Sequence, residues 1–107
     1  MRIASIVQYK DIMKFAALIE YGPDLSKIHE IRPTHRAYLA DLMKNGKLAI
    51  SGPFVDDSGA LIVYEAESAE EAESLISNDP FSKAKVFVRW QIRPWNPVFA
   101  NPALLPS

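Results

Sequence analysis

Proton transfer is the chemistry that the side chains of this sequence suit best. His35 lies in the segment Arg32–Gly46, where Leu39, Leu42 and Met43 recur at helical spacing and predict a buried stripe. A neutral imidazole is a common general base near pH 7, so His35 is the first candidate catalytic residue. A lone histidine on such a stripe is also a common core residue, and the sequence leaves that alternative open.

The ends of this segment predict where its helix begins and stops. Pro33 suits a first helical position, and Gly46 suits the position just past the last one. The chain before it, residues 24–31, is then a connector that carries the second histidine, His29. This boundary puts His35 in the first helical turn, where the helix dipole favours an uncharged ring.

Asp79 is the candidate partner of His35. It belongs to the run Asn78-Asp79-Pro80-Phe81, which stops a second helix because the residue before a proline is pushed out of helical geometry. If the two helices run roughly antiparallel on one face of a sheet, His35 and Asp79 can meet at one edge. A simple turn role for Asp79 is the alternative.

Further candidates for ligand contact surround these two residues. Ser51-Gly52-Pro53 ends a strand and leaves backbone N–H groups and a hydroxyl open, although for Ser51 by itself a simple loop without a function is the preferred interpretation. Arg32 suits an anionic ligand near the expected helix start. No Gly-x-Ser-x-Gly run surrounds Ser51, so no acyl-transfer triad is visible. A metal site from His29, His35 and Asp79 lacks an i, i+4 ligand pair, and we expect none.

Composition bounds the class of protein. The chain has 107 residues, enough for one domain with its own core, and 49% of them are hydrophobic. A formal net charge of −1 provides no electrostatic case for nucleic acid. There is no cysteine and no apolar run near the ~20 residues that cross a bilayer. The first residues turn polar too soon for a signal peptide, so we expect a cytoplasmic protein.

Alternation and turn signals predict an α+β fold. The expected order is β-α-β-β-α-β, a ferredoxin-like unit with a four-stranded antiparallel sheet and both helices on one face. Leu48 and Ile50 are expected to share a face, as are Val86, Val88, Trp90 and Ile92. A capping box, Ser68 to Glu71, opens the second helix. The expected strands cover residues 13–21, 47–51, 61–66 and 85–93.

The uncovered sheet face has a consequence for assembly. Each expected strand also turns apolar side chains away from the helices, and an exposed apolar surface of that size indicates a partner. We therefore expect a homodimer packed sheet to sheet.

Four spaced motifs together resemble the YciI-like, or YCII-related, family of the dimeric α+β barrel superfamily. They are Arg32-Pro-Thr-His-Arg-Ala-Tyr-Leu39, Ser51-Gly-Pro53, Asp79-Pro-Phe81 and Ile92-Arg-Pro-Trp95. The resemblance covers roughly residues 13–98, which leaves residues 1–12 as an N-terminal extension and 99–107 as a C-terminal tail. It implies a homodimer with a pocket that holds His35 and Asp79 as a catalytic pair and is lined by Ser51, Gly52 and Pro53.

The resemblance also implies a chemistry. An activity associated with the family is dehydrochlorination of a chlorinated hydroxyquinol in the breakdown of chlorinated aromatic compounds, which would make the chain a lyase that needs no cofactor or metal. Phe54 and Phe81 are candidates to stack on the substrate ring. The alternatives are a cofactor-free isomerase or monooxygenase acting on a small ring compound, and a non-catalytic ligand-binding dimer in which His35 and Asp79 are a structural pair.

Overall fold

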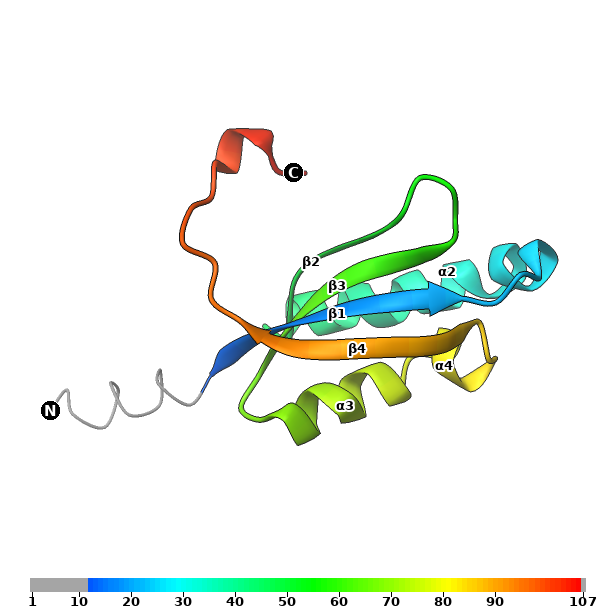
Figure 1. Ribbon diagram of the computed structural model, residues 1–107, viewed down its shortest axis with the longest axis horizontal. Helices are drawn as coiled ribbons and strands as arrows, with labels where there is room; N and C mark the ends of the chain where they lie inside the picture. The colour runs from blue at the N-terminus through cyan, green and yellow to red at the C-terminus, as the bar shows by residue number, and fades with distance from the viewer. Residues whose placement is uncertain (1–11, 107) are drawn as a thin grey trace, which may run out of the picture.

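The protein is an α+β unit in which two main helices cover one face of a four-stranded sheet (Figure 1). A computed structural model describes residues 12–106, and the extension expected over residues 1–12 falls almost wholly outside this range. The sheet is antiparallel in the order β2-β3-β1-β4, which confirms the predicted ferredoxin-like arrangement. The elements are β1 Met13–Tyr21, α2 Leu25–Lys44, β2 Leu48–Pro53, β3 Gly59–Ala66, α3 Ala69–Ser77, α4 Pro80–Lys83, β4 Phe87–Trp95 and the 3₁₀ helix η1 Pro102–Leu104.

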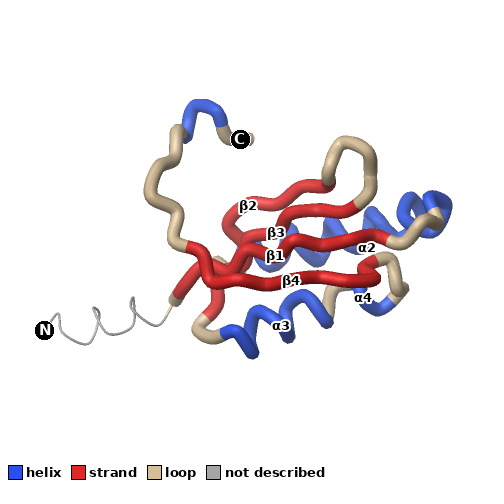
Figure 2. Tube along the Cα trace, in the orientation of Figure 1, coloured by secondary structure: helices blue, strands red, loops and turns tan. Residues whose placement is uncertain are grey.

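Figure 2 shows the helices in blue on one side of the red strands, and the hydrophobic core lies between these two layers. Strand β1 alternates as predicted, because every second residue from Phe15 to Tyr21 is buried on the helix side. Ile62 and Tyr64 of the neighbouring strand β3 join the same layer, together with Ile28 of α2 and Ile76 of α3. Alternation alone therefore determines which face of the central strands is covered.

Helix α2 begins seven residues earlier than the sequence predicted. Asp24 caps it by accepting a hydrogen bond from the backbone N–H of Lys27 at 3.1 Å, and Pro33 lies inside the helix. A proline costs an interior helix about 3 kcal/mol, but Ile28 is 1% exposed and anchors the extra turns to the core. His35 therefore lies near the middle of α2, and the expectation of a first-turn position with its dipole effect was wrong.

Two irregularities in the edge strands also differ from the predicted alternation. In β2 the register shifts so that Leu48 opposes Tyr64 while Ile50 opposes Val63. Such a bulge turns Leu48 into the core and leaves Ile50 on the uncovered face with 37% of its surface exposed. The expectation that these two residues share a face was wrong.

Strand β4 contains a second bulge at Val88. Tyr21 opposes Phe87 but Glu20 opposes Arg89, so one residue of β4 is extra. Phe87 therefore lies on the helix side with Trp90 and Ile92, and Val88 is 52% exposed, which corrects the predicted grouping.

The residues that the sequence marks for the C-terminus of α2 and for the N-terminus of α3 lie at these two helix ends. Gly46 has φ +75° just past α2, where glycine carries no side-chain penalty. At the start of α3, Ser68 accepts a hydrogen bond from the N–H of Glu71 at 3.1 Å. The Glu71 carboxylate reaches back to the N–H of Glu67 at 2.7 Å, one residue earlier than a capping box requires. No helix among residues 12–106 is long and apolar enough to span a bilayer, and the expected cytoplasmic location stays a prediction.

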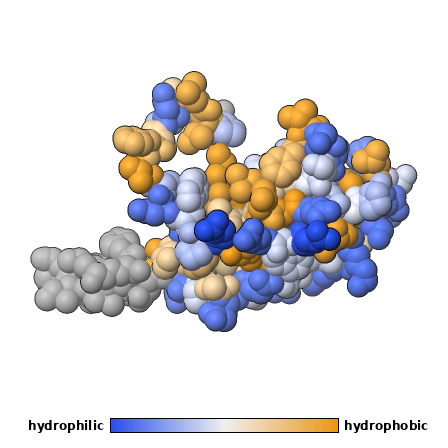
Figure 3. Space-filling model, viewed as in Figure 1, coloured by the Kyte–Doolittle hydropathy of each residue, from blue (hydrophilic) through white to orange (hydrophobic). Residues whose placement is uncertain are grey.

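The face of the sheet opposite the helices is apolar over β2 and β3 and charged along β4 (Figure 3). Leu18 of β1 and Leu61 of β3 oppose each other there and remain 55% and 42% exposed. Past β4, residues 96–106 form a segment that we call the C-terminal arm, which runs away from the sheet and turns back toward β2.

Candidate active site

His35 and Asp79 are in direct contact in the core of the protein. The Nδ1 atom of His35 lies 2.8 Å from Oδ1 and 2.9 Å from Oδ2 of Asp79. Asp79 is fully buried and His35 is only 6% exposed. A buried carboxylate needs hydrogen-bond donors, and the imidazole supplies one of them. The sequence proposed this meeting from topology, and the structure places the two groups within hydrogen-bond distance.

The local fold around Asp79 determines the direction of its carboxylate. Asp79 is the N-cap of α4, and its Oδ1 atom accepts a hydrogen bond from the N–H of Phe81 at 2.8 Å. Pro80 follows at the first helical position, where the missing N–H costs nothing. A short helix thus holds a carboxylate toward α2, a role that turn chemistry alone does not reveal.

Aromatic side chains hold the imidazole ring. Phe81 stacks on His35 with ring centroids 4.0 Å apart and planes 11° apart, and Phe87 meets the ring edge-on at 5.8 Å. Phe81 is fully buried, so its ring packs against the histidine and does not face the groove. This placement corrects the expectation that Phe81 stacks on a substrate ring.

The pairing leaves one nitrogen of His35 for chemistry. An ionised Asp79 accepts from Nδ1–H, so the neutral ring carries its lone pair on Nε2. Among residues 12–106 the hydrogen bonds of the His35 ring all involve Nδ1. His35 also lines the main cavity.

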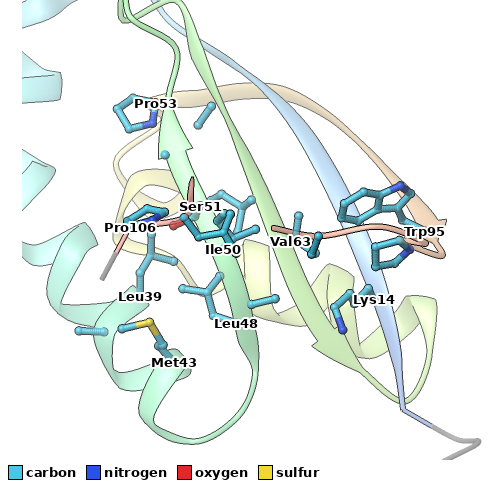
Figure 4. A pocket seen from close by; sticks show the side chains of 18 of the residues that line it. Lys14, Leu39, Met43, Leu48, Ile50, Ser51, Pro53, Val63, Trp95 and Pro106 are labelled. Atoms are coloured by element: carbon cyan, nitrogen blue, oxygen red, sulfur yellow. The ribbon is translucent and has the colours of Figure 1, made fainter. Parts of the chain in front are cut away.

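That cavity begins as a groove between α2 and strand β2 and continues beneath the C-terminal arm, with a total volume of about 870 Å³. In Figure 4, Leu39 and Met43 of α2 lie across from Ser51 and Pro53 of β2. Most of its lining is apolar, which suits an aromatic ligand oriented by a few polar groups.

The register of β2 explains which of the predicted residues face His35. Ser51 opposes Ile62 and Pro53 opposes Ala60, both on the helix side of β3. Gly52 opposes Leu61 on the uncovered face, although it still lines the cavity at the strand edge. The bulge before Ile50 therefore aims the Ser51 hydroxyl at the side of the sheet that holds the histidine.

The two remaining predicted contacts lie elsewhere. Arg32 forms an ion pair with Asp57 of the β2–β3 turn at 2.8 Å, and it is not among the residues that line the cavity. Phe54 is 39% exposed and is not among the lining residues either.

Sequence reasoning missed two polar residues of the groove. Tyr21 lines it from the end of β1, and burial raises the pKa of its phenol, although Arg32 works in the opposite direction. The phenol is therefore neutral near pH 7 and can donate a hydrogen bond. Arg36, next to His35 on α2, lines the groove as well and pairs with no carboxylate of the described chain. The sequence signal that could have identified Tyr21 as a groove residue is its position at the end of β1 on the covered face.

Carboxylates and imidazoles are the groups of this chain that could form a metal site. In the range 12–106 no three His, Cys, Asp or Glu side chains lie in positions to hold a metal ion together. His29, which the sequence placed in a connector, lies exposed on the second turn of α2 because this helix starts earlier than expected.

Comparison with known proteins places the chain in a family. The fold and the spaced motifs define a member of the YCII-related domain family, whose family model matches residues 13–96. The chain thus belongs to this family, as the motifs predicted. Relatives include Protein YciI of Escherichia coli O6:H1 and of Shigella flexneri, each 32% identical over 85 residues, with 70% of this chain and 87% of the relative covered.

A solved structure resembles the protein as well. It is 5-chloro-2-hydroxyhydroquinone dehydrochlorinase (TftG) from Burkholderia phenoliruptrix, in complex with 2,5-dihydroxybenzoquinone. The two chains are 31% identical with a TM-score of 0.70, and the match covers 78% of this chain and 94% of that one.

Proposed function

We propose that this protein is a small-molecule lyase that removes HCl from a chlorinated hydroxyquinol with His35 as the acid–base group. The observation that carries the proposal is the buried contact between Nδ1 of His35 and Asp79, made by a histidine that also lines the groove. The similar dehydrochlorinase and its bound quinone support this reaction class and a small aromatic substrate. No reaction in this class needs an external oxidant, because the ring is oxidised as the carbon–chlorine bond is reduced.

The proposed steps balance as loss of one proton and one chloride ion. Nε2 of His35 takes a phenolic proton, and the electron-rich ring then accepts a proton at the carbon that bears chlorine. Loss of a second phenolic proton expels chloride with the carbon–chlorine electron pair and leaves a quinone. Asp79 stabilises the imidazolium that forms in the first step, and such acid–base assistance contributes typically about 10²–10⁴-fold.

The polar groups of the groove have separate roles in this proposal. Arg36 balances the charge of the phenolate, and the Tyr21 phenol and the Ser51 hydroxyl orient ring oxygens through hydrogen bonds. The apolar walls from Leu39 and Pro53 hold the ring and exclude water.

The test is chloride release from a chlorinated hydroxyquinol by the wild type, by His35→Ala and by His29→Ala. His29 is the matched control because it lies exposed on the same helix. We expect release by the wild type and by His29→Ala, and its loss in a folded His35→Ala variant. Absence of release from the wild type, or equal release by all three proteins, would contradict the proposal.

We also propose that the protein is a homodimer that packs through the uncovered sheet face. Leu18 and Leu61 lie exposed at its centre and Ile50 at its edge, and a patch of this kind is normally covered in a stable protein. Light scattering at micromolar concentration tests this, and a monomeric mass would contradict it.

A further inference from the structure

The C-terminal arm is an apolar segment that the rest of its own chain leaves uncovered. Val98, Phe99 and Leu104 are 74%, 94% and 81% exposed. No residue from 94 to 107 carries a charged side chain. Single exposed apolar residues are normal, but a run of them on one short segment marks an interaction site.

The arm has a defined shape without support from the sheet. Two backbone hydrogen bonds lie within the arm. The Leu104 N–H donates to the Asn101 carbonyl at 3.0 Å, and the Leu105 N–H donates to the Pro102 carbonyl at 3.3 Å. The Asn101 side chain caps the same turn by accepting from the N–H of Ala103 at 3.1 Å. Prolines restrict the arm further, so little conformational entropy is lost when it binds a partner. It thus presents Leu104 and Leu105 on a preformed turn.

A complementary apolar surface exists on the same chain. Leu39, Met43 and Leu48 line the groove between α2 and β2, and arm residues Leu104 and Leu105 line the outer side of the same cavity. Figure 1 shows the arm running clear of the sheet, and the cavity that the arm and the groove line together has a volume of about 870 Å³. A chain that carries both an apolar arm and an apolar groove is self-complementary, which is the requirement for a two-fold exchange.

We infer that the C-terminal arm is exchanged between two copies of this chain, with Leu104 and Leu105 of one copy in the α2–β2 groove of the other. The arm follows Trp95, the last residue of β4, which opposes Lys14 on the uncovered sheet face, so its apolar surface is continuous with that face. The absence of basic residues in the arm disfavours a nucleic acid or an anionic membrane as its partner. The family model ends at residue 96, where the arm begins.

Exchange of the arm has a consequence for the groove. It closes the outer side of the cavity beside the partner's His35 with apolar side chains, so each groove is complete only in the dimer. The inference does not depend on the lyase chemistry proposed above, and its tests do not measure turnover.

Disulfide trapping tests the exchange directly, because the chain has no cysteine. Leu105→Cys and Met43→Cys are prepared as separate proteins with tags of different mass, refolded together and oxidised. We expect a mixed disulfide dimer on a non-reducing gel and by intact mass. Ser77→Cys, exposed at the end of α3, replaces Met43→Cys as the matched control and should give none.

The outcomes of the trapping experiment separate the possibilities. A disulfide that closes only within one chain of the double variant Met43→Cys/Leu105→Cys would overturn the exchange, because the arm would then fold on its own groove. No disulfide in either experiment would also overturn it, since the arm would not reach the groove at all.

Dimer dissociation provides a second measurement on the full chain. We expect Leu104→Ser/Leu105→Ser to raise the dimer dissociation constant about tenfold or more in sedimentation experiments, because two buried leucines become polar. Val55→Ser is the control, since Val55 is fully exposed on the β2–β3 turn outside the arm. An unchanged dissociation constant for the arm variant would overturn the inference.

Discussion

Asp79 and His35 are 44 residues apart in the sequence, yet the Asp79 carboxylate accepts the Nδ1 proton of His35 at 2.8 Å with both side chains buried. This relationship selects the tautomer that carries its proton on Nδ1 and its lone pair on Nε2. The same carboxylate is the N-cap of α4, so one side chain both begins that helix and orients the proposed base.

Asp79→Asn separates these two roles. Asparagine caps a helix about as well as aspartate, so we expect the variant to fold. Its amide can donate to Nδ1, which shifts the His35 proton to Nε2 and removes the base. Chloride release should fall about 10²–10⁴-fold while circular dichroism stays unchanged. A folded variant with wild-type turnover would refute the role of Asp79.

Phe81 should matter to stability much more than Phe54. Phe81 is fully buried and stacks on His35, so Phe81→Ala leaves a cavity and should cost about 3–5 kcal/mol in urea unfolding. Phe54→Ala is the control because Phe54 is 39% exposed, and it should cost less than about 1 kcal/mol. Equal losses would show that the packing around the histidine is not what stabilises this region.

Tyr64 offers a prediction about alkaline pH. Its hydroxyl is buried without a hydrogen-bond partner in the described structure, and burial, helped by the charge of Asp79, raises the pKa of Tyr64 above the ordinary 10.0. The unfolded chain then ionises first, so stability that is present below about pH 10 is lost as the pH rises further. Tyr64→Phe removes this loss.

Urea unfolding at pH 7 and at about pH 10.5 measures the effect. We expect Tyr64→Phe to be at least as stable as the wild type at pH 7, because the lost hydroxyl had no partner. It should also lose less stability between the two pH values. Tyr21 and Tyr38, whose pKa values burial also raises, account for part of the remaining change. Identical pH slopes for the two proteins would contradict the assignment.

Arg36 should affect substrate binding more than the chemical step. Arg36 lines the groove beside His35, where its guanidinium can form a charge-assisted contact with a bound phenolate. Because this contact stabilises the bound substrate, Arg36→Gln should raise KM about tenfold with a small change in kcat. Lys44→Gln on the exposed end of the same helix is the control and should leave KM unchanged. A fall in kcat alone would place Arg36 in the chemistry rather than in binding.

Much of the fold could be predicted from local patterns. Strand β1 and helix α3 were predicted correctly because alternation, capping residues and an Asp-Pro stop act over a few neighbours. The start of α2 could not be predicted, since a proline inside a helix is unfavourable by itself, and the burial of Ile28 and the cap by Asp24 favour the longer helix. The bulges that redirect Ile50 and Val88 likewise depend on pairing across strands.

The candidate site divides in the same way. The sequence by itself determined that His35 lies on a helix, that Asp79 follows the end of another, and that Ser51-Gly52-Pro53 lies at the end of a strand, because each assignment rests on adjacent residues. The predicted last residue of that strand, Ser51, was two residues short, since β2 continues to Pro53. Only the tertiary structure decided that Asp79 reaches His35, that Phe81 packs behind the ring, and that Tyr21 and Arg36 share the groove. These contacts join residues far apart in the chain, and their distances follow from how a helix packs on a twisted, bulged sheet.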